Sequence, residues 1–166
     1  MPGAVRRADW FVLLDPTWQS EGSPSDPPAE VIVGGWRLDK DGSLGPFQSN
    51  PRYIPANNSI PTDPIDALLR LITNGENCAE QIIQTLKDTV VQIGCDDQGQ
   101  LCVGTAPDDV PCVLVVTAEI HKQHSKLPRW RSILGAQLPK VVPAGLDILF
   151  NAGGNHQFRI VTDAIQ

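Results

Sequence analysis

Few residues in this chain have the type and spacing that catalysis or metal binding requires. His121 and His124 lie three residues apart and would share one face of a helix, as metal ligands do, but no third ligand lies nearby. Ser125 is adjacent to His124, and adjacent side chains do not readily meet as a nucleophile and its base. We therefore predict a chain that is not an enzyme and holds no metal, with solvated histidines.

Two loop-like segments resemble ligand-binding loops only in part. Asp39-Lys-Asp-Gly42 matches the start of a calcium loop, but the later ligands and the closing glutamate are missing. Gly153-Gly154 is expected between two strands and not before a helix, so no helix N-terminus would help to bind a phosphate there. We predict turns at both places and expect no cofactor.

The chain has 4 cysteines, and none of them lies in a CxxC pair. A turn centred on Gln98-Gly99 would place Cys95 opposite Cys102 in a hairpin. Opposed residues have Cβ atoms about 4.5 to 5.5 Å apart, which is close enough for a disulfide after a small adjustment. In a reducing cytosol two half-buried thiols are the simpler expectation, and a Cys95–Cys102 disulfide stays open as the alternative.

Tryptophan gives the clearest indication of a binding role. The chain has 4 Trp, 1 Tyr and 4 Phe, and Trp is enriched at the hot spots of protein interfaces. Trp10 and Trp36 are expected in strands and in the core, whereas Trp18 follows Asp15-Pro16 in a loop. Trp130 lies between Arg129 and Arg131, and we expect it either to anchor a partner or to cap the core. The residues that we predict to bind a protein partner are Trp18, Arg129, Trp130 and Arg131.

Composition limits the class of protein. A chain of 166 residues with 41% hydrophobic and 19% charged residues fits one domain, with a possible division into 1–60 and 61–166. A net charge of −6 argues against nucleic acid, which is bound by clustered Lys and Arg. No apolar run is long enough for a membrane span and the first residues lack the pattern of a signal peptide, so we expect a cytoplasmic protein without membrane insertion.

Residue patterns predict an α+β fold. Period-two patterns and turn residues predict a mostly antiparallel sheet. Asp63 with Pro64 predicts the start of a helix that Asn74-Gly75 ends, and Asn77 with Glu80 predicts a capping box for a second helix. We expect two to four helices in all. Strands are predicted at 10–14, 31–38, 44–47, 90–95, 101–105, 110–117, 147–151 and 157–161, and a mixed, partly helical segment at 130–142.

Several motifs together resemble the actinobacterial proteins described as type VII secretion system-associated, whose C-terminal part is similar to the SseB domain. They span nearly the whole chain. The fairly specific ones are Leu14-Asp-Pro-Thr-Trp18, Val33-Gly-Gly-Trp-Arg37, Asn50-Pro-Arg-Tyr53 and Pro61-Thr-Asp-Pro-Ile-Asp-Ala-Leu68. The looser ones are Val110-Pro-Cys-Val-Leu-Val-Val-Thr117 and Pro143-Ala-Gly-Leu-Asp-Ile-Leu-Phe-Asn151-Ala-Gly-Gly154.

This resemblance implies an SseB-like fold and a cytoplasmic protein connected with ESX-type secretion, and it brings no catalytic residue with it. Its partner would be a type VII secretion component or substrate, of unknown stoichiometry. Two roles follow as hypotheses: an adaptor or chaperone-like binding module, and an immunity or inhibitor protein for a secreted toxin. The segment 122–131 departs from the resemblance because it is unusually basic.

Overall fold

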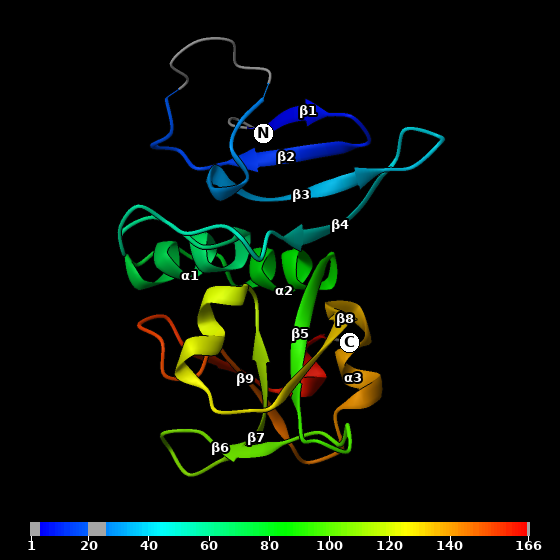
Figure 1. Cartoon of the computed structure of the whole chain (residues 1–166). Helices are drawn as coiled ribbons and strands as arrows, with labels where there is room; N and C mark the ends of the chain where they lie inside the picture. The colour runs from blue at the N-terminus through cyan, green and yellow to red at the C-terminus, as the bar shows by residue number, and fades with distance from the viewer. Residues whose placement is uncertain (1–3, 20–25, 166) are drawn as a thin grey trace.

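A computed structural model describes residues 4–19 and 26–165 and shows an α+β protein built on one mostly antiparallel sheet (Figure 1). The predicted fold class is confirmed. The strand order is β1-β2-β3-β4-β5-β7-β9-β10, with β6 paired to β7 and β8 paired to β5. The strands are β1 (Ala4–Arg7), β2 (Trp10–Leu14), β3 (Ile32–Leu38), β4 (Leu44–Ser49), β5 (Thr89–Cys95), β6 (Val103–Thr105), β7 (Pro111–Val116), β8 (Arg129–Leu134), β9 (Asp147–Phe150) and β10 (Phe158–Ile160).

Three α-helices and four short 3₁₀ turns complete the described chain. The helices are α1 (Pro64–Thr73), α2 (Ala79–Lys87) and α3 (Leu138–Val141), and the 3₁₀ turns are Ala29–Val31, Glu119–His124, Gly135–Gln137 and Thr162–Ile165. In Figure 1 the strands β1–β4 lie on one side of α1 and α2, and β5, β7, β8 and β9 lie on the other. The sheet is continuous across the predicted boundary near residue 60, because β4 and β5 pair in parallel.

The N-terminal strands pair as successive antiparallel neighbours, which agrees with the prediction except that β1 was not expected. Gly34 in β3 is required by a close approach: a Cβ there would lie 2.4 Å from the Phe47 ring and 2.4 Å from the Gln48 carbonyl oxygen. The Phe47 ring, buried beside Val33 and Tyr53, fills the small core of this region. The packing of Phe47 against β3 therefore requires glycine at position 34, which has no side chain to clash with the ring.

Helix α1 begins as the sequence predicts. The Asp63 carboxylate accepts hydrogen bonds from the main-chain N–H groups of Ile65 and Asp66, and Pro64 takes the first helical position. Gly75 ends the helix with φ +92°. The predicted capping box of α2 is wrong by one residue, since Cys78 is the N-cap and its side chain makes no capping hydrogen bond.

The main core lies between the helices and the second half of the sheet. Strand β7 pairs with β5 and β6 on one edge and β9 on the other, as expected for its apolar sequence. Buried side chains from α1, α2, β5, β7, β8, α3, β9 and the C-terminal turn form one cluster: Ile65, Leu69, Ile82, Leu86, Val91, Ile93, Val113, Val115, Ile133, Leu138, Val142, Ile148, Phe150 and Ile165.

The predicted register of the Cys95 hairpin is wrong by one residue. Cys95 lies opposite Leu101, not Cys102, and all four cysteines are free thiols. The cause is the loop geometry: the N–H of Asp96 donates to the Gln100 carbonyl, and Gly99 adopts φ +81°, which adds one residue to the turn. Facing positions shift by one, and the geometric basis for a Cys95–Cys102 disulfide disappears.

The segment 130–142, predicted as partly helical, divides into strand and helix. Ile133, Leu134 and Leu138 have helical spacing, but residues 129–134 form β8 and pair with β5 over six positions, from Leu134 opposite Val90 to Arg129 opposite Cys95. Only 138–141 is α-helical. Pairing with a neighbouring strand therefore prevails over the local apolar spacing.

Candidate functional site

A large apolar cleft lies between the sheet formed by β2–β4 and the helices α1 and α2. Its volume is about 1140 Å³, and it is partly open to solvent. Leu13, Val33 and Phe47 supply one wall, and Ala67 and Leu68 of α1 supply the other. The residues of the two walls are at least twenty positions apart in the sequence, so only the folded chain creates the cleft.

Two half-buried tryptophans, Trp18 and Trp36, line the cleft. Trp36 packs edge-on against Phe47, with ring centroids 5.0 Å apart. Neither indole N–H has a hydrogen-bond partner within the described residues, although buried Trp donors usually find one. The cleft therefore offers a wall of aromatic and aliphatic area.

The loop that carries Trp18 is held by the buried carboxylate of Asp15. Asp15 accepts hydrogen bonds from the main-chain N–H of Thr17 (2.8 Å), the Thr17 hydroxyl (2.6 Å) and the Tyr53 hydroxyl (2.9 Å). Burial raises the pKa of Asp15, but the hydrogen bonds from Thr17 and Tyr53 outweigh it and lower the pKa. Asp15 lines the cleft as an ionised group whose hydrogen bonds are already made within the chain.

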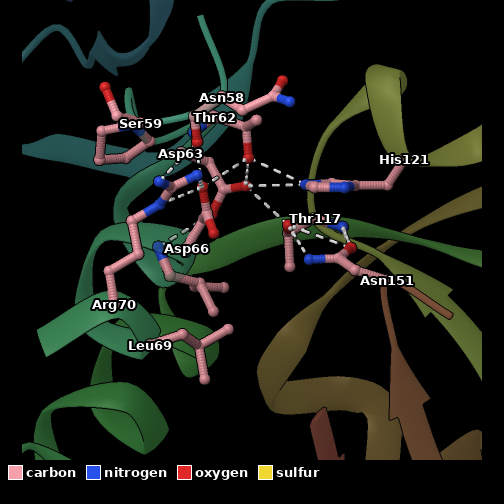
Figure 2. A network of polar contacts seen from close by, with 12 residues as sticks. Asn58, Ser59, Thr62, Asp63, Asp66, Leu69, Arg70, Thr117, His121 and Asn151 are labelled. Atoms are coloured by element: carbon pink, nitrogen blue, oxygen red, sulfur yellow. Dashed lines mark hydrogen bonds and ion pairs between the residues drawn. The ribbon is translucent and has the colours of Figure 1, made fainter. Parts of the chain in front are cut away.

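A buried polar network centred on Asp63 lies beside the cleft (Figure 2). Asp63 is 1% exposed, and one of its oxygens caps α1. The other oxygen accepts hydrogen bonds from the hydroxyls of Thr62 (2.9 Å) and Thr117 (2.6 Å). One carboxylate thus connects the start of α1 to the end of β7.

Asn151 extends this network to the end of β9. Its side-chain oxygen accepts the main-chain N–H of Thr117 (3.0 Å), and its amide nitrogen donates to the Thr117 hydroxyl (3.0 Å). Asn151 adopts φ +51°, a left-handed conformation that Asn tolerates better than most residues. The parallel strands β7 and β9 end at the same edge of the sheet, which places both side chains under α1.

His121 closes the network on the side away from the cleft. Its Nε2 lies 2.9 Å from the Thr62 hydroxyl and 3.9 Å from the nearer Asp63 oxygen. Because the single Thr62 hydroxyl proton points to the Asp63 carboxylate, His121 donates its Nε2–H to Thr62. Burial lowers the pKa of His121, opposed by the negative charge of Asp63, and burial raises the pKa of Asp63.

A second, small hollow of about 100 Å³ lies beyond His121. Asp66 and Arg70 line it, and one Asp66 oxygen accepts two hydrogen bonds from the Arg70 guanidinium, at 3.1 Å each. The other Asp66 oxygen is buried and has no hydrogen-bond partner among the residues that the structure describes. No group of three or more His, Cys, Asp and Glu side chains within residues 4–19 and 26–165 is arranged to hold a metal ion.

The network is better suited to fixing structure than to catalysis. A nucleophilic threonine needs its proton directed at a base and its oxygen open to a substrate. The Thr117 hydroxyl is buried between Asp63 and Asn151, and the Thr62 hydroxyl lies between Asp63 and His121. The hydroxyls of Thr62 and Thr117 are therefore both engaged in hydrogen bonds within the protein.

The predicted binding residues do not form one site. Trp18 lines the cleft, whereas Trp130 lies on β8 with the ammonium of Lys122 5.9 Å from its ring centroid. Arg129 and Arg131 are exposed on the same strand. Trp36, expected in the core, is instead half-buried in the cleft wall.

Sequence reasoning missed the polar network, although one signal for it was present. Thr117 and Asn151 each follow an apolar strand directly, and polar residues at the ends of neighbouring parallel strands meet at one edge of a sheet. His121 gave no comparable signal, because its partner Thr62 is 59 positions away.

No protein-family model, curated protein or solved structure matches this chain. No helix among the described residues is long and apolar enough to span a membrane.

Proposed function

We propose that this chain is a non-catalytic protein-binding module, an adaptor or chaperone-like protein of type VII secretion that acts in the cytoplasm, and that its cleft binds an apolar segment of the partner. The observation that carries the proposal is the open apolar cleft with Trp18 and Trp36 in its walls. Trp residues with these properties dominate the binding energy of many protein interfaces.

The size and chemistry of the cleft favour a protein segment over a small molecule. Its volume of about 1140 Å³ exceeds the range of roughly 300 to 1,000 Å³ that is usual for small-molecule pockets. Its lining is mostly apolar, and the buried carboxylates of Asp15 and Asp63 already accept hydrogen bonds within the chain. An amphipathic helix that lays its apolar face in a groove needs few polar contacts.

The link to secretion rests on the motifs, and these motifs meet at the cleft. Asp15, Pro16 and Trp18 come from the first motif, Val33 and Trp36 from the second, and Pro61, Asp63 and Pro64 from the fourth, and all of them line the cleft. Tyr53 of the third motif binds Asp15. The fairly specific motifs thus meet at the cleft, whereas no residue of the two looser motifs lines it.

Affinity purification of the tagged chain from the cells that make it, followed by mass spectrometry, tests the proposal. We expect a secretion component or substrate to be recovered with the wild-type chain and lost with Trp18→Ala. Trp10→Ala is the matched control, because Trp10 is also half-buried but does not line the cleft. If the partner is still recovered with Trp18→Ala, as it is with Trp10→Ala, the proposal is contradicted. Recovery of a single toxin would favour the immunity role.

A further inference from the structure

Strand β8 is an edge strand in the part of the chain that the structure describes. It pairs with β5 over six positions without a register shift, and no second strand there pairs with it. In Figure 1 it lies beside β5, on the side of α1 and α2 that is opposite β1–β4. Unprotected edges of this kind can accept an additional strand.

The pairing of β5 shows which groups of β8 point outward. The N–H of Cys102 donates to the carbonyl of Gly94 (3.1 Å), so Gly94 directs its main chain away from β8. Main-chain direction alternates along a strand, and Ile93 therefore directs its N–H and C=O toward its β8 partner, Arg131. The main chain of Arg131 is used in this pairing.

The neighbours of Arg131, Trp130 and Ser132, consequently direct their N–H and C=O groups away from β5. These groups have no hydrogen-bond partner among the described residues. Ser132 is exposed and Trp130 is half-buried. Two residues thus present free donors and acceptors at the spacing that a further strand requires.

Unpaired positive charge surrounds this edge. Lys126, Arg129 and Arg131 are exposed and form no ion pair with any described residue, in a chain of net charge −6. Lys122 is different, because it pairs with Glu119 at 2.7 Å. Two copies of this edge would repel each other, whereas carboxylates on an incoming strand would be attracted.

We propose that the outer edge of β8 binds an extended acidic segment of a protein partner, which adds to the sheet as a further strand. The main-chain groups of Trp130 and Ser132 supply the hydrogen bonds, and Arg129 and Arg131 select for acidic side chains. This surface is separate from the cleft. It extends the proposed protein-binding role to a second contact and does not depend on occupation of the cleft.

The test uses two blocked peptides of about ten residues, one alternating Glu with Val and the other alternating Lys with Val. Binding to the full chain is followed by the amide NMR shifts and hydrogen exchange of β8. We expect the Glu peptide to shift and protect the amides of Trp130 and Ser132, and the Lys peptide to bind about tenfold more weakly or not at all.

Two variants separate the contributions of charge and main chain. The double variant R129E/R131E should reverse the preference between the peptides. Ser132→Pro should abolish binding with the charges intact, because it removes an outward N–H and leaves the β5 pairing in place. Circular dichroism checks that both variants fold.

Trp18→Ala should leave peptide binding unchanged, so failure of the cleft proposal would not affect this result. Equal binding of both peptides, an unchanged preference in R129E/R131E, or shifts confined to the cleft would overturn the proposal.

Discussion

The two sides of Asp63 differ in polarity, because a hydrogen-bonded network lies on one side and an apolar cleft on the other. On one side, the polar side chains form hydrogen bonds with one another; they are the Asp63 carboxylate, Thr62, Thr117, Asn151 and His121. On the other side, the cleft presents the aromatic and aliphatic surface of residues such as Trp18, Trp36 and Leu68. The difference indicates that the network fixes the position of α1, and it supports the proposal that the cleft binds a partner.

The two sides should also contribute differently to the stability of the fold and to the binding of a partner. A buried group that loses its partners destabilises the fold, because its desolvation is no longer offset. A half-buried Trp at the wall of an open cleft contributes less to folding and more to an interface. Variants on the two sides should therefore affect different measurements.

The largest effect is expected for Asp63→Ala. This change removes the cap of α1 and leaves the Thr62 and Thr117 hydroxyls without their acceptor, which should lower the free energy of unfolding by about 3 kcal/mol. Urea denaturation measures the loss. Asp63→Asn retains an oxygen for the cap and should lose less. Equal stability of Asp63→Ala and the wild type would mean that the network does not hold α1.

On the cleft side, Trp18→Ala should weaken partner binding by about 2 kcal/mol, or roughly 30-fold, and leave the urea midpoint nearly unchanged. Isothermal titration with the partner identified by purification measures the affinity. Trp10→Ala should bind as the wild type does. A large loss of stability without loss of binding would remove the distinction between the two sides.

A smaller effect is expected for the hydroxyl of Thr117. Thr117→Val keeps the shape but leaves Asp63 and Asn151 without a shared partner, which should lower the free energy of unfolding by about 1 to 2 kcal/mol. Thr117→Ser keeps the hydroxyl and serves as the control. If the two variants are equally stable, the hydrogen bonds of Thr117 contribute nothing and only its methyl group matters.

The smallest effect is a pH dependence from His121. Burial lowers its pKa below the ordinary 6.5, so the unfolded chain binds the proton more readily. Stability from this group is present above pH 6.5 and is lost as the pH falls through the lower pKa of the folded state. The raised pKa of Asp63 acts in the opposite sense: its contribution is present at low pH and is lost as the pH rises through the folded value.

Urea denaturation between pH 7 and pH 5 measures the net effect. His121→Gln, which can still donate to Thr62, should flatten the fall in stability just below pH 6.5. His124→Gln removes one of the charges that lower the pKa of His121, and it should therefore reduce the fall in stability only in part. The same slope in His121→Gln as in the wild type would show that His121 is not responsible.

Local patterns predicted the elements whose determinants are close in sequence. Asp63-Pro64 and Gly75 specify the ends of α1 through their own main-chain contacts, and both predictions are confirmed. The apolar run of β7 indicated a strand buried on both faces for the same reason. Such signals need no knowledge of distant residues.

Contacts between distant segments were beyond the reach of these patterns. Strand β8 depended on pairing with β5, whereas the error in the Cys95 register was local and came from the turn at Gly99. The cleft and the network depend on partners far apart, such as Thr117 and Asp63, which are separated by 54 positions. Of the residues that line the cleft, Trp18 alone was predicted from the sequence to bind a partner, and the cleft itself was not predicted.

Site-specific photo-crosslinking tests the role of the cleft most directly. A benzoylphenylalanine placed at Trp36 would lie in the cleft wall, and the same residue at Trp10 provides the control. In the cells that make the protein, we predict a covalent adduct with one protein from position 36 and none from position 10. An adduct of small-molecule mass, identical adducts from both positions, or no adduct from position 36 would contradict a protein-binding cleft.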